Sequence, residues 1–319
     1  MREFARRQER FRGLMIGLAL GDAQVGPDGK ALVAGAATDL AMRQLHALIR
    51  SWRSPNGRSE STLVDATIQD LESFVYNTDE PTSVQVAPWP WFAENPLFHK
   101  RRGNPRATVE AVNNGLKLFG GTSKGVQGML RVAPLAALWL NPTADDIKEL
   151  VSLSVCLTHD MDYVANPSIL FCVLLARLAT SPSEARRDVI VDTFREAPVT
   201  KVDEYFSTAG GEVDFDHLKQ VAANGRAHRL LAAAMYLASC DVEIEGAMLY
   251  AAGTADPDGL GALACALMGA STGATPWMEA QFAKHEYAWQ IEMLVRDLFI
   301  VGVTCDEPLE ELVARYPVW

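Results

Sequence analysis

Asp256 and Asp258 stand one residue apart, immediately before a run of Gly, Ala and Ser over 259–273. Pro257 and Gly259 are poor helix formers, so both carboxylates are expected in a turn that precedes a helix of small side chains. Two acids held in a turn against a closely packed helix are costly unless a cation neutralises them. The pattern indicates a metal site. One Asp that caps the helix beside a second, solvated Asp would explain the same residues.

Asp22 ends the stretch 12–23, in which glycines at 13, 17 and 21 allow a helix to be packed tightly. A buried carboxylate is costly unless it is paired or hydrogen-bonded. Asp22 is therefore interpreted either as a structural cap for a neighbouring segment, which the local sequence favours, or as a catalytic group.

Thr38 and Asp39 begin a predicted helix over 38–53 and offer a hydroxyl and a carboxylate. Mg²⁺ and Ca²⁺ prefer such oxygen donors. N-capping of the same helix by either residue is the alternative, and the local sequence favours it.

A Gly-containing segment over 123–134 is a further candidate binding element. Gly125 and Gly128 allow backbone N–H groups to face a ligand, and a helix that starts after them would favour a phosphate. The segment is not a Walker loop because Lys124 precedes the first glycine; a plain entry into a helix is the alternative. His159 is a lone histidine, a type that is more often structural than a ligand or base, and no second histidine nearby supports zinc.

Helical spacing recurs along the whole chain, as in Leu45, Leu48, Ile49 and Trp52. Strand patterns are nearly absent. We therefore predict a single compact all-α domain over 1–319 with about a dozen helices. Residues 143–146 form a predicted capping box at the start of the helix over 145–157. The predicted helical ranges beyond 38–53 are 61–76, 107–118, 145–157, 167–180, 185–195, 215–239, 243–252 and 284–301.

The least regular region is 77–106, which contains five prolines and the pair Trp89 and Trp91. A long loop in a compact domain is usually functional or mobile. The two aromatic side chains could cover a pocket or pin the loop to the core, and the sequence does not choose between these roles.

The formal net charge of −11 over 319 residues argues against nucleic acid as a partner, because phosphate binding needs clustered Lys and Arg. None of the five cysteines forms a C-x-x-C pair, which is typical of a reduced, cytoplasmic protein. No secretory signal and no run of about 20 apolar residues is present, so no membrane association is expected. The oligomeric state stays open.

Six segments, taken in order, resemble the ADP-ribosylglycohydrolase family. Residues 11–23 resemble its R-G-x-x-x-G-x-x-x-G-D-A opening, 37–42 its T-D-D-T-x-M, and 102–108 its R-x-P-G-x-T. Residues 123–134 resemble S-K-G-C-G-G-V-M-R-V-A-P, 158–159 the start of T-H-x-H-P, and 254–273 the G-D-x-D-T segment with its small-residue helix.

The resemblance implies an all-α domain with Mg²⁺ at the floor of a cleft, where the metal holds a ribose and a glycosidic bond is hydrolysed through an oxocarbenium-like state. The implied metal ligands are Thr38, Asp39, Asp256 and Asp258. The implied catalytic residues are Asp22, Asp39 and Asp256. The implied substrate-binding residues are Ser123, Gly125, Gly128, Met129 and His159.

This chain departs from the family pattern at the metal motifs. Residues 37–40 keep a single acid, and Gly259 replaces the last Thr of D-x-D-T. Two Mg²⁺ ions bring +4, whereas Asp39, Asp256 and Asp258 bring −3. One ion rather than two is expected, or none.

The leading expectation is a hydrolase that removes ADP-ribose from a modified protein side chain or cleaves a related ribosyl nucleotide. One alternative is a degenerate member that binds an ADP-ribose-like ligand or a partner protein without hydrolysis. Another is a hydrolase of an NAD-derived N-riboside in a biosynthetic pathway. The altered segments around residues 126–127 and 160–162 are compatible with all three.

Overall fold

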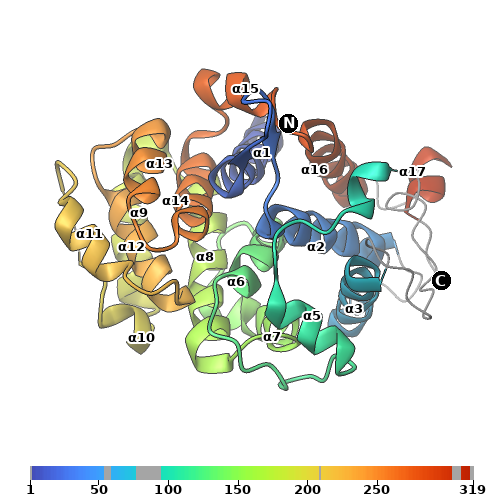
Figure 1. Cartoon of the computed structure of the whole chain (residues 1–319). Coiled ribbons are helices and arrows are strands. Elements are labelled where there is room, and N and C mark those ends of the chain that lie inside the picture. Colours follow the sequence, from blue (N-terminus) through green and yellow to red (C-terminus); the bar gives the residue numbers. More distant parts are fainter. Residues whose placement is uncertain (1, 54–58, 77–94, 208–209, 304–309, 317–319) are drawn as a thin grey trace.

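The computed structural model describes residues 2–53, 59–76, 95–207, 210–303 and 310–316, and these are folded almost entirely into helices (Figure 1). The predicted all-α class is confirmed. Trp89 and Trp91 lie outside the described residues. The elements up to residue 138 are α1 (Arg2–Asp22), β1 (Gln24–Val25), β2 (Leu32–Val33), α2 (Ala36–Arg53), α3 (Glu60–Tyr76), η1 (Pro96–His99), α5 (Arg106–Asn113), α6 (Gln127–Val132) and η2 (Ala133–Leu138).

The remaining elements complete the helical array around the first ones. They are α7 (Ala144–Cys156), η3 (Met161–Ala165), α8 (Asn166–Thr180), η4 (Ser183–Ala185), α9 (Arg186–Glu196), α10 (Thr200–Asp203), α11 (Phe215–Val221), α12 (Ala227–Ser239), α13 (Ile244–Ala252), α14 (Pro257–Thr272), α15 (Pro276–Phe282), α16 (Ala288–Val303) and α17 (Glu310–Arg315).

Helices α1 and α14 lie side by side at the centre of the molecule, with their backbones in direct contact (Figure 1). A Cβ atom added to Gly17 would lie 2.1 Å from the carbonyl oxygen of Cys265, and one added to Gly21 would lie 2.2 Å from the carbonyl carbon of Gly261. From the other side, a Cβ on Gly269 would lie 2.1 Å from the oxygen of Gly13. The small-residue spacing in both segments is thus explained by this helix pair, as the sequence predicted.

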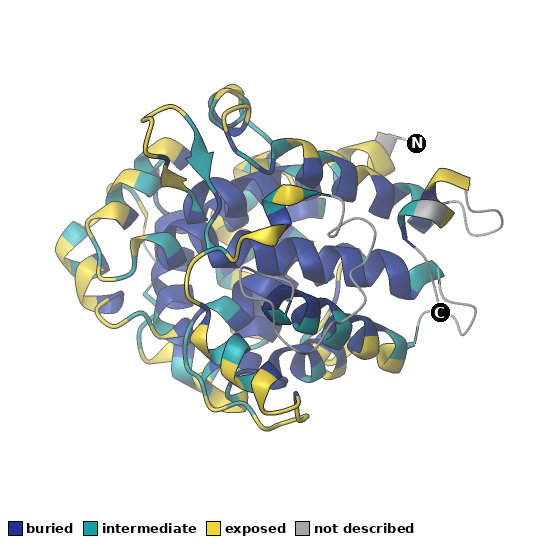
Figure 2. Ribbon diagram, turned by 45° about the vertical axis from the view of Figure 1, so that its right-hand side comes forward, coloured by how far each residue is buried: buried dark blue, intermediate teal, exposed yellow. Residues whose placement is uncertain are grey.

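The other helices surround this central pair. Helices α8, α12 and α13 pack on α14, whereas α2 packs on α3, α6 and α16. The interior helices are buried along most of their length, and exposed residues are concentrated on peripheral helices and connections (Figure 2). One continuous apolar core includes residues from Phe11 of α1 to Leu312 of α17. This arrangement fixes the ends of α1, α2 and α14 relative to one another.

The predicted helical ranges are largely confirmed, and the capping box is present, with Thr143 and Asp146 each bonded to the other's backbone N–H. The prediction of one helix over 215–239 was wrong. The chain breaks between α11 and α12, where Gly225 adopts a left-handed φ of 60° that interrupts a helix. The helix predicted over 107–118 ends at Asn113. The short ribbon β1–β2 is antiparallel and joins α1 to α2.

One helical stretch of the described residues, Met161–Thr180, is long and apolar enough to cross a membrane, which the sequence reading did not anticipate. Within its most apolar window, 78% of the residues are buried inside the protein. A core helix has this composition because every one of its faces contacts other apolar side chains.

We predict that Gly17→Ala destabilises the protein by about 2 kcal/mol or more, because the new methyl group meets rigid backbone rather than a movable side chain. The matched control is Gly246→Ala in α13, where the added Cβ meets only the end of the Val242 side chain. Because Ala also favours helix more than Gly, that control should be neutral or stabilising. Urea unfolding of both variants measures the difference, and equal effects would contradict the prediction.

Candidate functional site

Asp256 and Asp258 lie at the start of α14. Asp256 is the N-cap residue, and its Oδ1 accepts a hydrogen bond from the Gly259 N–H at 3.0 Å. Pro257 occupies the first helical position, where its missing N–H costs nothing, so Asp258 lies inside the first turn rather than in a preceding turn. Both side chains are half-buried. Burial raises the pKa of Asp256, and the negative charge of Asp258 raises it further. The hydrogen bond from Gly259 acts in the opposite direction.

Asp22 connects the end of α1 to the start of α2. Its Oδ2 accepts hydrogen bonds from both the N–H and the hydroxyl of Thr38, each at 2.8 Å. It therefore caps α2 from a neighbouring helix, the structural role favoured by its sequence context. Burial raises the pKa of Asp22 to about 7 against these two bonds, and the charge of nearby Asp258 contributes to the rise. Gln24, two residues further on, donates to Asp258 Oδ2 at 3.2 Å.

Two loops close against the start of α14. A Cβ on Gly259 would lie 2.8 Å from Val126, and a Cβ on Gly225 would lie 3.0 Å from Asp256 Oδ2. The loops also pair with each other, because Gly125 forms an antiparallel bridge with Arg226 and the Ala227 N–H donates to the Lys124 carbonyl at 3.0 Å. Segments more than 100 residues apart in the chain thus meet at one carboxylate turn.

Each of the two loops carries a cationic residue beside the bridge, Lys124 in one and Arg226 in the other. Lys124 is half-buried and Arg226 is exposed. The Lys124 ammonium lies 3.7 Å from the centre of the Tyr163 ring, and Lys201 lies 5.6 Å from the same ring. Tyr163 also contacts the edge of the buried His228 ring, at 5.3 Å between centroids.

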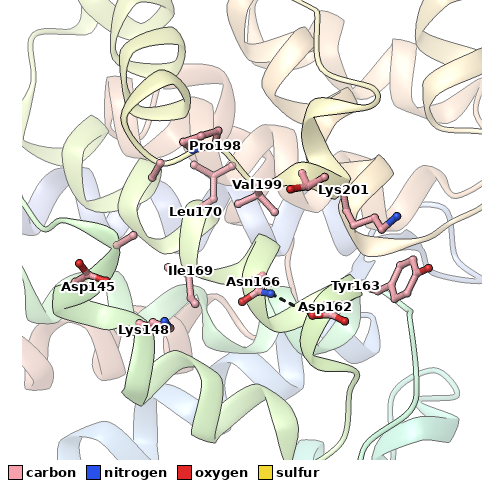
Figure 3. Close-up of a pocket in the computed structure, with 13 residues that line it drawn as sticks. Asp145, Lys148, Asp162, Tyr163, Asn166, Ile169, Leu170, Pro198, Val199 and Lys201 are labelled. Atoms are coloured by element: carbon pink, nitrogen blue, oxygen red, sulfur yellow. Dashed lines mark hydrogen bonds between the residues drawn. The ribbon is translucent and has the colours of Figure 1, made fainter.

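A cavity of about 480 Å³ opens on the far side of Tyr163 (Figure 3). Ile169, Leu170 and Val199 form its apolar part. The charged groups Asp145, Lys148, Asp162 and Lys201 stand around it, at both sides of the view. None of the residues that were predicted to bind substrate or metal lines this cavity.

Ser123 lines a different, polar cavity of about 430 Å³, together with Arg106 and Lys117. Its hydroxyl accepts a hydrogen bond from the Gly125 N–H at 3.3 Å, and its carbonyl accepts one from Asp160 at 2.9 Å. Of the predicted substrate-binding residues, Ser123 and Gly125 are partly accessible.

The other three predicted substrate-binding residues are buried. Met129 is fully buried in the core, and Gly128 lies inside α6 with its Cα face against the His159 ring. His159 is 1% exposed and its Nδ1 is 2.6 Å from the Thr158 hydroxyl. Burial lowers the pKa of His159 to about 3, and the charge of Arg131 adds to this effect. His159 is thus a neutral internal residue that holds the 158–160 loop, which corrects its assignment to the ligand side.

Asp39 forms an ion pair within its own helix. It is fully buried in the first turn of α2, and its Oδ1 accepts from Arg43 Nε at 2.8 Å. Its charge also favours the ionised form of Arg102 and disfavours ionisation of Tyr287. Its surroundings are therefore cationic and aromatic rather than acidic.

With this geometry established, comparison with known proteins identifies the fold. The ADP-ribosylglycohydrolase family model matches residues 4–307. The chain belongs to the ADP-ribosylglycohydrolase family. A solved structure described as an ADP-ribosylglycohydrolase-related protein complex matches with a TM-score of 0.60 at 19% identity, over 94% of this chain and 100% of that one, a likeness that concerns the fold alone. A comparison with curated proteins found no match.

In this member of the family, the described residues do not fit the metal centre that the family resemblance implies. Within the described ranges, no group of three or more His, Cys, Asp or Glu side chains is placed to hold a metal ion. Asp39 is paired with Arg43, and the Thr38 hydroxyl donates to Asp22. The predicted set of Thr38, Asp39, Asp256 and Asp258 is therefore not assembled around one point.

The sequence pattern did not identify Arg43 or Arg226. Arg43 lies four residues after Asp39, the spacing at which opposite charges meet on a helix, so the pair was detectable. Arg226 carried no such signal, because it reaches the site only through the bridge to Gly125.

We predict that His159→Asn makes the stability of this family member less sensitive to acid. The His159 pKa is lowered from 6.5 to about 3 in the folded protein, so between these values the unfolded chain binds the extra proton and stability falls as pH falls. The slope approaches 1.4 kcal/mol per pH unit for one such group.

The comparison is made between wild type and variant, because Asp22, with its raised pKa, acts in the opposite direction. Urea unfolding at pH 7, 6 and 5 provides the three free energies. Parallel pH dependences of wild type and His159→Asn would show that His159 is not buried in its neutral form.

Proposed function

We propose that this chain cleaves a ribosyl glycosidic bond at the start of α14, with ADP-ribose on a modified protein side chain or a smaller ribosyl nucleotide as substrate. The observation that carries the proposal is the pair of acids Asp256 and Asp258 at the half-buried start of α14, against which the two bridged loops that carry Lys124 and Arg226 close. A ribosyl diphosphate has the complementary character, since it becomes positive at its anomeric carbon during cleavage and is negative at its phosphates.

The carboxylates would act on the anomeric carbon. When the bond from that carbon to the leaving nitrogen or oxygen breaks, its electron pair leaves with the side chain and the ribose becomes oxocarbenium-like. The negative charges of Asp256 and Asp258 stabilise that cation. A water then bonds to the anomeric carbon and loses a proton to Asp256, whose pKa, raised by burial, makes it a better base than a solvated carboxylate. The leaving nitrogen or oxygen, which kept the electron pair of the broken bond, takes up a proton from solvent.

Asp22 has a positioning role in this proposal. Both hydrogen bonds to its Oδ2 come from Thr38, so its carboxylate links the end of α1 to the start of α2. Its proximity to Asp258 sets the electrostatic environment of the α14 turn without requiring contact with substrate.

The cations would hold the diphosphate. Lys124 is oriented by its contact with the Tyr163 ring, and Arg226 is fixed through the backbone bridge to Gly125. A partly buried lysine whose ammonium already lies over an aromatic ring loses less entropy on binding an anion than a free surface lysine does.

The Mg²⁺ expected from the family resemblance has no step in this proposal, because the donor residues do not gather around one point. Hydrolysis would depend on the carboxylates and the protein's own cations.

Binding without hydrolysis is a second candidate function, and the Asp39–Arg43 pair favours it. The pair removes one predicted catalytic carboxylate from the reaction centre. Calorimetry with ADP-ribose, combined with product analysis on ADP-ribosylated arginine, ribosyl nucleotides and NAD-derived N-ribosides, separates the two. Binding with no turnover across that panel supports the binding protein, whereas turnover of any member supports the hydrolase and identifies its substrate.

We predict that Asp256→Asn lowers turnover at least about 100-fold, the contribution of a general base, while changing stability little because the amide oxygen can still accept from Gly259. The control is Asp192→Asn on the exposed face of α9, which should keep wild-type activity. Full activity of Asp256→Asn would exclude Asp256 as the base.

We also predict that Lys124→Met weakens ADP-ribose binding about 10-fold and reduces its dependence on salt, since one phosphate-facing charge is removed. Lys219→Met, on the exposed surface of α11, carries the same charge change away from the site and should bind normally. Calorimetry at two salt concentrations measures both effects, and equal affinities for the two variants would contradict the assignment of the diphosphate to the Lys124 loop.

A further inference from the structure

We propose that the Arg43 guanidinium takes the place of a divalent cation at Asp39, so that this member of the family is organised at the start of α2 without metal. The pair is internal to one helix, with Arg43 one turn after Asp39. It rests on the proposed function only for the location of the site, and its test does not depend on hydrolysis.

Burial makes this pairing strong and permanent. Arg43 is 2% exposed and Asp39 is 0% exposed, so neither charge is solvated. The Arg43 guanidinium carbon lies 5.1 Å from the centre of the Phe74 ring and 5.9 Å from that of Phe98, which favours a cation at this point. Arg43 also donates to the Asp70 carbonyl at 3.4 Å. The cation is held from several sides.

The charge around Asp39 is already balanced. Arg43 neutralises it, and Arg102, whose ionised form Asp39 favours, is itself paired with Glu286 at 2.7 Å. Asp39 Oδ2 is buried and accepts no hydrogen bond from the described residues, the kind of atom that a metal could use. A divalent ion on that oxygen would, however, stand beside the Arg43 charge in a poorly solvated interior, where like charges repel strongly. The positive charge of Arg43 therefore disfavours metal binding at Asp39 Oδ2.

The other metal ligands that the family resemblance implies have different partners. Thr38 donates its hydroxyl proton to Asp22, and the charges that raise the pKa values of Asp22 and Asp256 come from Asp258. The acids near α14 thus form one electrostatic group, and Asp39 forms another with its arginines. The loss of an acid at 37–40 and the presence of Arg43 one turn later are consistent with each other, since both lower the need for a metal cation at Asp39.

Replacing Arg43 with a neutral residue should make a cation at Asp39 favourable again. Breaking a buried ion pair leaves an uncompensated charge, which strongly destabilises the folded protein. In Arg43→Met, Asp39 would be left in this condition, and a small divalent cation would be the simplest replacement. Arg43→Met, but not the wild type, is thus expected to bind and be stabilised by Mn²⁺.

The experiment uses the full chain after treatment with EDTA, with Mn²⁺ as probe. Electron paramagnetic resonance measures bound Mn²⁺, and thermal unfolding with and without Mn²⁺ measures its effect on stability. Wild type should unfold at the same temperature in EDTA and in Mn²⁺. Arg43→Met should unfold at a lower temperature that Mn²⁺ partly restores. The double variant Asp39→Asn/Arg43→Met should lose that response to Mn²⁺.

Wild-type Mn²⁺ binding or stabilisation that Asp39→Asn abolishes would overturn the proposal, because Asp39 would then be a metal ligand despite Arg43. An Arg43→Met variant with the same Mn²⁺ response as the double variant would overturn it as well. If Arg43→Met does not fold, the comparison of wild type with Asp39→Asn decides: the proposal expects Asp39→Asn to unfold at a lower temperature with unchanged Mn²⁺ binding. Failure to bind ADP-ribose would affect only the proposed function.

Discussion

The backbone contact between α1 and α14 is the constraint on which the rest of the structure depends. Gly13 faces Gly269, Gly17 faces the Cys265 backbone and Gly21 faces Gly261, each so closely that no Cβ atom fits at these glycines of α1. Such an approach leaves little freedom in the relative position of the helix ends. Asp22 at the end of α1 and Asp258 at the start of α14 are therefore brought within electrostatic reach, and their environment follows from the packing rather than from flexible loops.

The loops at the site are shaped to complete that arrangement. The bridge between Gly125 and Arg226 joins the entry to α6 with the entry to α12, and Gly225 leaves room for the Asp256 carboxylate. His159 supports the same region from inside, as a neutral ring against Gly128. Several residues that look functional by type are thus structural supports, and the groups available for chemistry are fewer and closer together than the sequence pattern indicates.

The acids of this protein lie in two different electrostatic environments. Asp256 and Asp258 of α14 have no ion pair among the described residues, whereas Asp39 is neutralised by Arg43 of its own helix. An internal cation is always present and cannot exchange, while a metal ion depends on its concentration. This difference motivates the view that the chain keeps the family's fold and binding surface with an altered centre.

The sequence by itself determined the helical class, the family, the small-residue packing of 12–23 and 259–273, and the capping box at 143–146, because each is written in local spacing. It could not separate the two roles of Asp22, or place Met129 inside and Arg226 at the site. Those outcomes depend on which distant segment a side chain meets. Only the tertiary structure paired Asp39 with Arg43 instead of with Asp256, because a charge interacts with the nearest opposite charge in space, and that neighbour is decided by packing.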